Sequence, residues 1–299
     1  MKYKYDIVAL GDVNLDSVVA KNLIFPFSSL VQNGIIYWED VNEIPGGSGL
    51  NFCVFAKELG YRSLLLSKVG KDFAGDVITT WLKQKGISVQ SNWLSKSPTG
   101  RAIIMRDSSD IRLLVNNKEN ANHTLDLNDI EGNRENIASC RVLYISGYNI
   151  SEPQTIRYKA TMQAIDYAKS SSAPPIIVID VVPHRIYENF TFNQFRELTK
   201  NVDILISEVA TMRRFLGLGS KSEIIDDDMA KDSVGQIIQF YDRLILRFGR
   251  SGCDNQILVN KLSGSFSCEE TGHRLAPDKR GFGDKLTLIA LRDFFKVLP

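Results

Sequence analysis

The run Ile176-Ile177-Val178-Ile179 decides the fold class of this chain. It is apolar on both faces, as a strand covered by helices on either side must be. Similar short runs lie at Ile7–Gly11, Ser63–Val69, Val142–Ser146, Ile204–Ser207 and Arg243–Phe248. Stretches of helical period lie between or after them, at Gly49–Leu59, Gly75–Lys85, Ile156–Lys169, Val209–Leu216, Ser233–Tyr241 and Gly283–Lys296. This alternation predicts an α/β fold, a doubly wound, mainly parallel sheet flanked by helices.

The chain has 299 residues, of which 43% are hydrophobic, and this suits a single α/β domain over residues 1–299. Lys and Arg number 36 against 35 Asp and Glu, so no broad cationic face for nucleic acid or a membrane surface is expected. No run approaches the ~20 apolar residues that span a bilayer. The first residues lack the apolar region of a signal peptide. We therefore expect a soluble, cytoplasmic protein.

Cysteines and acidic residues offer no metal site. The four cysteines, with no CxxC pair among them, are expected to be buried free thiols: Cys53, Cys140, Cys253 and Cys268. The run Asp226-Asp227-Asp228 is interpreted as a solvated loop or the start of a helix.

Two regions, of about residues 13–45 and 97–120, alternate apolar and polar residues and contain no convincing helix. Ile35–Trp38 and Arg101–Met105 have the pattern of strands with one covered face, and Asp107–Asp110 that of a hairpin tip. The two regions either pair into a small separate sheet that covers a site on the main sheet, or form edge strands of one larger sheet.

The turn Gly281-Phe282-Gly283-Asp284 precedes an apolar-periodic run. Glycines before a helix let backbone N–H groups converge, and the helix N-terminus adds partial positive charge, so the turn can bind phosphate. Asp284 in the first helical turn could accept a proton from an attacking hydroxyl. The alternative is a Gly-rich loop in which Asp284 only caps the helix.

A second glycine-rich segment, Gly46-Gly47-Ser48-Gly49-Leu50-Asn51, also leads into a helix. Paired glycines permit close approach of a ligand to the backbone, and Ser48 and Asn51 offer groups that bind sugar hydroxyls. A turn with a helix cap would use the same residues.

The order of three segments resembles that in the ribokinase-like (PfkB) carbohydrate kinases. The segments are Gly11-Asp12-Val13-Asn14-Leu15-Asp16, then Gly46–Asn51, then the turn Gly281–Asp284. Further segments are similar to family motifs: Val69–Gly75 (VGxDxxG), Thr99–Ala102 (TGxA), Ser146-Gly147 (SG), Asp180 with Pro183 and Arg185 (DxxxR), and Arg247–Gly252 (LGxxG). The resemblance covers essentially the whole chain.

The resemblance implies ATP-dependent transfer of a phosphoryl group to a hydroxymethyl group of a sugar or nucleoside, with Mg²⁺. It makes Asp284 the base and the amides of Gly281, Phe282 and Gly283 the anion hole. The implied acceptor-binding residues are Asn14, Asp16, Gly46, Gly47, Ser48 and Asn51. The implied nucleotide-binding residues are Ser207, Glu208, Arg247, Gly249 and Gly252. The alternating regions become a β-sheet lid, which in relatives often also forms a homodimer interface.

Several positions depart from the family pattern. Lys279 and Phe282 replace Thr and Ala of DTxGAGD, and Lys285 follows the base, where it either meets phosphate or points to solvent. The NxxE motif, which organises magnesium-bound waters, becomes Ser207-Glu208-Val209-Ala210. Glu208 then either supports the metal through water or is an ordinary acid at a helix start.

The chain also ends 15 residues after Asp284, where relatives continue through another helix. This implies a reduced nucleotide site or a truncated chain. Two functional hypotheses follow: an active small-molecule kinase, and a catalytically impaired relative that binds a sugar or nucleotide. Retention of Asp284 favours the first, since the base is normally lost early when activity is lost.

Overall fold

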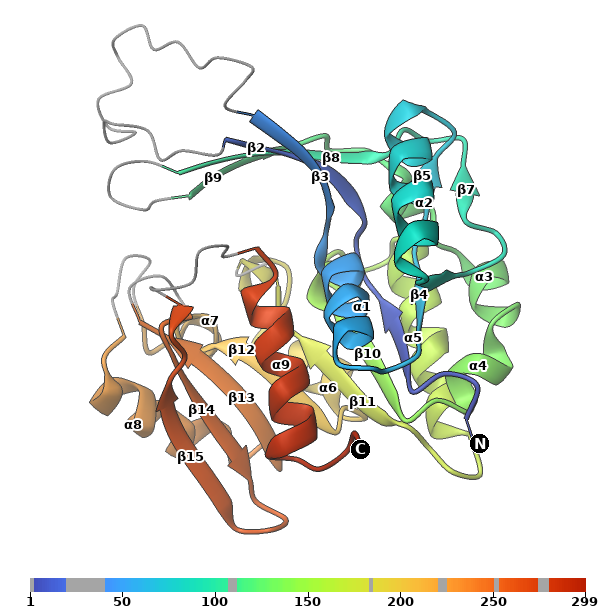
Figure 1. The fold of residues 1–299 in the computed structure, drawn as a ribbon. Helices are drawn as coiled ribbons and strands as arrows, with labels where there is room; N and C mark the ends of the chain where they lie inside the picture. The colour runs from blue at the N-terminus through green and yellow to red at the C-terminus, as the bar shows by residue number, and fades with distance from the viewer. Residues whose placement is uncertain are drawn as a thin grey trace, which may run out of the picture.

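The computed structural model describes residues 3–19, 41–106, 112–182, 185–219, 225–249, 253–273 and 280–299. In these residues a large sheet is flanked by helices on both faces, and a small sheet lies above one edge of it (Figure 1). The predicted α/β fold with a mainly parallel, doubly covered sheet is confirmed.

The large sheet has nine strands in the described residues. In spatial order they are β15 (Ser265–Glu270), β14 (Asn255–Asn260), β13 (Arg243–Phe248), β12 (Ile204–Glu208), β11 (Ile176–Asp180), β10 (Val142–Ser146), β1 (Ile7–Leu10), β4 (Ser63–Leu66) and β6 (Ser88–Val89). The strands from β13 to β6 are parallel, so their carboxyl ends lie along one edge. Ligands bind along such an edge in open α/β sheets.

Two helical layers bury the faces of this sheet. One layer holds α1 (Ser48–Glu58), α2 (Phe73–Lys85) and α9 (Phe282–Asp293). The other holds α3 (Leu127–Glu131), α4 (Arg134–Ala138), α5 (Ile156–Lys169), α6 (Phe192–Thr199), α7 (Val209–Phe215) and α8 (Asp227–Ile237). Strand β10 shows why both faces must be apolar: Leu143 and Ile145 pack in one layer, and Val142 and Tyr144 in the other.

Most predicted central strands and helices are confirmed within a few residues, but two parts of the prediction need correction. Helix α8 begins at Asp227 rather than Ser233, because the Asp226 side chain caps it by accepting a hydrogen bond from the Met229 amide. The acidic run is thus a helix start. The antiparallel strands β14 and β15 were not predicted, and β15 is exposed along nearly all its length, so its sequence lacks an apolar signal.

The small sheet has the strand order β3 (Val41–Gly46), β2 (Asn14–Val19), β8 (Gly100–Arg106) and β9 (Arg112–Asn116). It joins the two alternating regions, since β2 pairs with β8 in parallel, so edge strands of one larger sheet are ruled out. Strand β8 confirms the strand expected at Arg101–Met105. The expected strand Ile35–Trp38 and hairpin tip Asp107–Asp110 lie outside the described residues. A separate pair, β5 (Val69–Gly70) and β7 (Leu94–Ser95), lies next to α2.

Cys53 and Cys140 are buried free thiols, as expected, whereas Cys253 is partly exposed and Cys268 is exposed on β15. The expectation of four buried thiols is therefore wrong for Cys268, because the edge strand that carries it has no layer over it. In the described residues, no helix combines the length and apolar character needed to cross a membrane.

Candidate active site

The turn before α9 is held in a conformation that favours glycine. Gly281 has φ 60°, in the left-handed region, and a Cβ atom there would lie 2.8 Å from Phe55 Cε2 and 2.9 Å from Asn51 Cβ. Gly281 thus brings the glycine turn against α1, the helix that follows the other glycine-rich segment (Figure 1). No side chain caps α9, so Asp284 is not the N-cap. The amides of the first turn keep the capacity to bind an anion.

Asp284 lies in the first turn of α9, and the residue as a whole is half-buried. Its Oδ1 accepts a hydrogen bond of 3.2 Å from the Tyr144 hydroxyl of β10. The pKa of Asp284 is raised to about 8, chiefly by burial and also by the Asp180 carboxylate, while Arg247 and the Tyr144 hydrogen bond act in the opposite direction. A carboxyl that titrates near neutral pH is suited to accept a proton.

Arg247 connects the carboxyl edge of the sheet to α9. Its guanidinium lies 3.5 Å from Asp180 and donates to the Gly283 carbonyl at 2.8 Å and the Thr287 hydroxyl at 2.6 Å. The side chain is buried, and Gly283 leaves no room for a Cβ, which would lie 2.9 Å from Nη1. The resemblance implied a nucleotide contact for Arg247. The structure places its guanidinium beneath the turn, bonded to protein groups.

Phe282, which replaces the family Ala, turns its ring toward His273 in a T-shaped contact with a centroid distance of 5.1 Å. His273 is buried with Nδ1 3.7 Å from Asp254. Gly249, at φ 110°, packs against the same Asp254, whose Cβ would lie 2.7 Å from an added Cβ. The Phe282 ring is therefore packed on His273, beside the turn. Lys285 is exposed, which agrees with the solvent alternative.

Two other residues for which the resemblance implied nucleotide binding lie at the end of β12. Ser207 is buried, and Glu208 ends the strand directly opposite Arg247 of β13. Gly252 lies outside the described residues. No group of three or more His, Cys, Asp or Glu side chains that could hold a metal occurs in the part of the chain that is described. Glu208 lies at the carboxyl edge of β12, and Asp180 ends the neighbouring strand β11 at the same edge.

The glycines predicted to bind the acceptor are fixed by close contacts with backbone and side-chain atoms. A Cβ at Gly46 would lie 2.1 Å from Asp16 Oδ2, and Gly47 has φ 100°. Gly49 packs on Gly11 of the turn after β1, with 2.7 Å between an added Cβ and the Gly11 backbone. These contacts bring the first two sequence motifs together at the start of α1.

One side chain of the predicted acceptor-binding segments contacts the carboxyl edge of the large sheet. The Ser48 hydroxyl donates to Ser146 Oγ, at the end of β10, over 2.8 Å. Asn14 and Asp16 lie on one face of β2, and Asp16 is buried. Asn51 lies against Gly281, so the segment predicted to bind the acceptor and the turn predicted to bind an anion are in direct contact.

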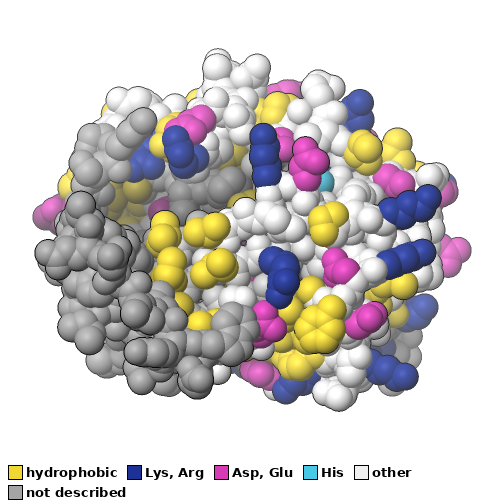
Figure 2. All heavy atoms as spheres, turned by 90° about the horizontal axis from the view of Figure 1, so that it is seen from above, with side chains coloured by type: hydrophobic (Ala, Val, Ile, Leu, Met, Phe, Trp, Pro, Cys, Tyr) yellow, Lys and Arg dark blue, Asp and Glu magenta, His cyan; other side chains and the backbone are white. Residues whose placement is uncertain are grey.

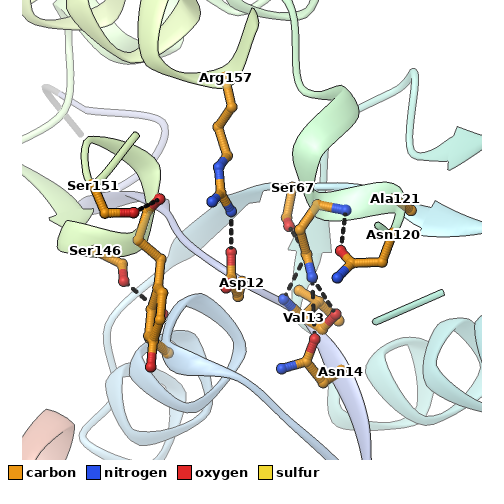
Figure 3. Close-up of polar contacts among 12 residues, drawn as sticks. Asp12, Val13, Asn14, Ser67, Asn120, Ala121, Ser146, Ser151 and Arg157 are labelled. Carbon is orange, nitrogen blue, oxygen red and sulfur yellow. Dashed lines mark hydrogen bonds and ion pairs between the residues drawn. The ribbon is translucent and has the colours of Figure 1, made fainter. Parts of the chain in front are cut away.

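Asn122 is a residue of this region that sequence reasoning missed. Its Oδ1 accepts from the Val13 amide at 2.9 Å and the Ser67 hydroxyl at 3.1 Å, and its Nδ2 donates to Asn14 Oδ1 at 3.1 Å. Figure 3 shows Val13, Asn14 and Ser67 lying close to one another. No short-range pattern indicates this role, because the partners are more than 50 residues away in sequence.

Asp12 and Arg157 point toward each other in the same view, with an Nη1–Oδ1 distance of 2.7 Å (Figure 3). Both side chains are largely buried. The pair fixes the chain where it leaves β1 for β2. Arg157, on the face of α5 toward the sheet, was also missed, since a charged residue in a helix is usually on its solvated face.

The VGxDxxG-like and TGxA-like segments form one clasp. Asp72 caps α2 and also accepts hydrogen bonds from the Thr99 amide at 2.8 Å and hydroxyl at 2.6 Å. The Thr99 hydroxyl in turn accepts from the Gly70 amide at 2.9 Å. Thr99 directly precedes β8, so this clasp fixes the small sheet to the main body. Its residues contact one another rather than the turn at α9.

The small sheet exposes apolar side chains on one face. Ile103, Leu113 and Val115 are 46%, 39% and 48% exposed, and Ile103 pairs directly with Val115. Asp16 pairs with Ala102, so it lies on the opposite face from Ile103. Figure 2, seen from above, shows hydrophobic side chains gathered on this side of the molecule.

The sequence profile of the pfkB carbohydrate kinase family matches residues 5–253. The chain belongs to this family. The matched range ends before the Gly281–Asp284 turn, so the geometry of that turn is an independent observation.

Solved structures show the same fold. Adenosine kinase from Sinorhizobium meliloti is 18% identical, with a TM-score of 0.69 over 89% of this chain and 80% of the other. Ribokinase from Giardia lamblia is 21% identical, with a TM-score of 0.67 over 89% and 74%. Halothermothrix orenii fructokinase is 18% identical, with a TM-score of 0.69 over 98% and 94%. These similarities establish the ribokinase-like fold.

Proposed function

We propose that this carbohydrate kinase transfers the γ-phosphoryl group of ATP to a hydroxymethyl group of a sugar or nucleoside, with Asp284 as the general base. The observation that carries the proposal is the position of Asp284. Its carboxyl lies in the first turn of an uncapped helix, has a pKa raised to about 8, and is next to a turn that contacts the acceptor segment.

The reaction needs a proton acceptor and a site for developing negative charge. Asp284 takes the proton of the acceptor hydroxyl, and that oxygen then forms a bond to phosphorus as the bond to ADP breaks. The amides of Gly281, Phe282 and Gly283 would bind the equatorial phosphoryl oxygens. Asn14, Asp16, Gly46, Gly47, Ser48 and Asn51 would hold the acceptor hydroxyls.

Mg²⁺, when bound, shares the negative charge of the phosphates. The carboxylate of Glu208 at the carboxyl edge fits this ion, because Mg²⁺ keeps several waters and can be held through them. Ser207 of β12 and Gly249, which directly follows the neighbouring strand β13, lie at the same edge and would border the nucleotide. Gly252 belongs to the same proposed nucleotide site. Arg247 would act indirectly by fixing Gly283.

The test is ATP turnover on a panel of sugars, sugar phosphates and nucleosides. We expect turnover with at least one acceptor, and a loss of about 10²–10⁴-fold in kcat for Asp284→Asn. Asp293→Asn is the matched control, since Asp293 is a solvent-exposed acid at the other end of the same helix. Wild-type turnover by Asp284→Asn would refute its role as base.

A second candidate is a family member that binds sugar or nucleotide without catalysis. The replacement of the NxxE motif by Ser207 and Ala210, and of the family Thr by Lys279, favour it. Nucleotide binding by calorimetry with no turnover on any acceptor would establish this candidate and refute the first.

The exposed apolar face of the small sheet supports a further proposal, that two copies pair through it as a lid and dimer interface. Ile103 and Val115 are neighbours on this face, which is opposite to the face that carries Asp16. Ile103→Lys should shift the mass measured by light scattering from dimer to monomer. Leu262→Lys, on a 66% exposed residue in the β14–β15 turn, should not. A wild-type monomer at high concentration would refute the proposal.

A further inference from the structure

Tyr144 is the residue on β10 whose side chain reaches the proposed base. It is fully buried, and its ring stacks on Phe52 of α1 with a centroid distance of 3.7 Å and an interplanar angle of 8°. A buried tyrosine hydroxyl requires a hydrogen-bond partner. That partner is Asp284 Oδ1 at 3.2 Å, a residue 140 positions away in sequence.

The hydroxyl approaches the carboxyl from the interior of the protein. Tyr144 shares the layer of α1 and α9, and two residues further along β10, at the carboxyl end, Ser146 accepts the hydrogen bond from Ser48. The interior hydroxyl and the proposed acceptor residues therefore contact different parts of the site. With Oδ1 engaged from inside, the second carboxylate oxygen is the one left for an acceptor hydroxyl.

Tyr144 stays protonated over the working pH range. Burial and the nearby Asp284 and Asp180 carboxylates raise the pKa of Tyr144 well above its usual value. Its hydroxyl is therefore a permanent donor, and a hydrogen bond donated to a carboxylate favours the charged form of that carboxylate.

We propose that Tyr144 is a positioning residue for the base: its hydroxyl holds Oδ1 of Asp284, orients the carboxylate toward the acceptor and favours its ionised form. This inference rests on the proposed function of Asp284. The other charged or titratable groups that face Asp284 come from three elements: Asp180 of β11, Arg247 of β13 and the Cys53 thiol of α1. The hydrogen bond to Oδ1 itself comes from the Tyr144 hydroxyl.

The variant Tyr144→Phe removes one oxygen atom and keeps the ring that stacks on Phe52. We expect the acid limb of the kcat/KM profile to move about one pH unit upward, with about a tenfold loss below its midpoint and a smaller loss at high pH. KM for ATP should change little. Tyr241→Phe is the matched control, since the buried Tyr241 hydroxyl bonds to Thr199 in the other helical layer, 2.8 Å away.

The outcomes separate this inference from the proposed function. If Asp284→Asn is inactive and Tyr144→Phe has the wild-type pH profile, only the role of Tyr144 is refuted. If Asp284→Asn keeps full turnover, the proposed function itself fails. A purely structural role would lower the melting temperature, as in Tyr241→Phe, without moving the pH profile.

An NMR titration of the wild-type protein tests the hydrogen bond directly. It can be read even if Tyr144→Phe folds poorly or the enzyme is inactive. In the wild-type protein, the ¹³Cζ NMR signal of Tyr144 should show an inflection at the pH where the ¹³C carboxyl signal of Asp284 titrates. Asp284→Asn, which assigns the carboxyl signal, should abolish the inflection. A Tyr144 signal that is insensitive to this titration would refute the hydrogen bond and the inference with it.

Discussion

The replacement Arg247→Met tests whether the buried bridge between the sheet and α9 holds the candidate site together. Arg247 lies 3.5 Å from Asp180, and the two side chains are only 8% and 9% exposed. The same guanidinium donates to the Gly283 carbonyl and the Thr287 hydroxyl. Methionine keeps much of the side-chain volume but removes all three interactions.

The expected loss follows from burial. Removing one partner of a buried ion pair costs about 3–5 kcal/mol, because the remaining charge loses its counter-charge in a poorly solvated position. Domains are stable by about 5–15 kcal/mol, so the loss is a large fraction of the total. Arg247→Met should therefore lower the unfolding free energy by about 3–5 kcal/mol, measured by chemical denaturation.

A double-mutant cycle assigns this loss to the pair. Asp180→Asn removes the buried charge that Arg247 balances, so the double variant should be more stable than the sum of the single losses predicts, by at least about 1 kcal/mol. Arg101→Met is the control, since Arg101 is 53% exposed in its pair with Glu43 and should cost less than about 1 kcal/mol. Strictly additive losses would refute the coupling.

The pKa of Asp284 gives the cycle a second readout. Arg247 lowers this pKa and Asp180 raises it, so Arg247→Met should move the Asp284 titration upward and Asp180→Asn should move it downward. Shifts in the same direction would show that the charges do not act on Asp284 as the structure indicates.

Three further predictions test the turn, the clasp and the base. Gly281→Ala should lower the unfolding free energy, measured by chemical denaturation, by about 2–4 kcal/mol, because it adds left-handed backbone strain and overlap with α1. Gly264→Ala, at φ 69° with open space around it, should show the strain alone. Equal losses in the two variants would contradict the packing argument. Thr99→Val should cost about 1–3 kcal/mol, since Asp72 loses a buried donor, and a loss under about 0.5 kcal/mol would contradict the clasp. The folded-state pKa of Asp284 is raised to about 8 from 3.8, so its favourable contribution to stability is fully present below pH 3.8 and is lost as pH rises to about 8. The melting temperature of Asp284→Asn relative to wild type should therefore rise between about pH 4 and 8 and then level off, and a constant difference would contradict the raised pKa.

Local patterns in the sequence determined the central architecture. Strands such as Ile176–Asp180 are apolar on both faces, and that property depends only on neighbouring residues, so their bounds could be predicted closely. The turn at Gly281 could be predicted for a similar reason, since a glycine before a helix is a local signal. The exposed edge strand β15 carries no such signal and was missed.

The contacts that shape the candidate site were decided by the tertiary structure. The Tyr144 hydroxyl meets Asp284, and the Asn122 side chain meets Val13, only because parallel strands bring distant segments to one edge. The family resemblance implied that Arg247 contacts the nucleotide. In the structure its guanidinium lies beside Asp180 and donates a hydrogen bond to α9. A sequence records which residues alternate or turn locally, whereas a pairing across more than 100 residues depends on how the sheet and its helical layers assemble.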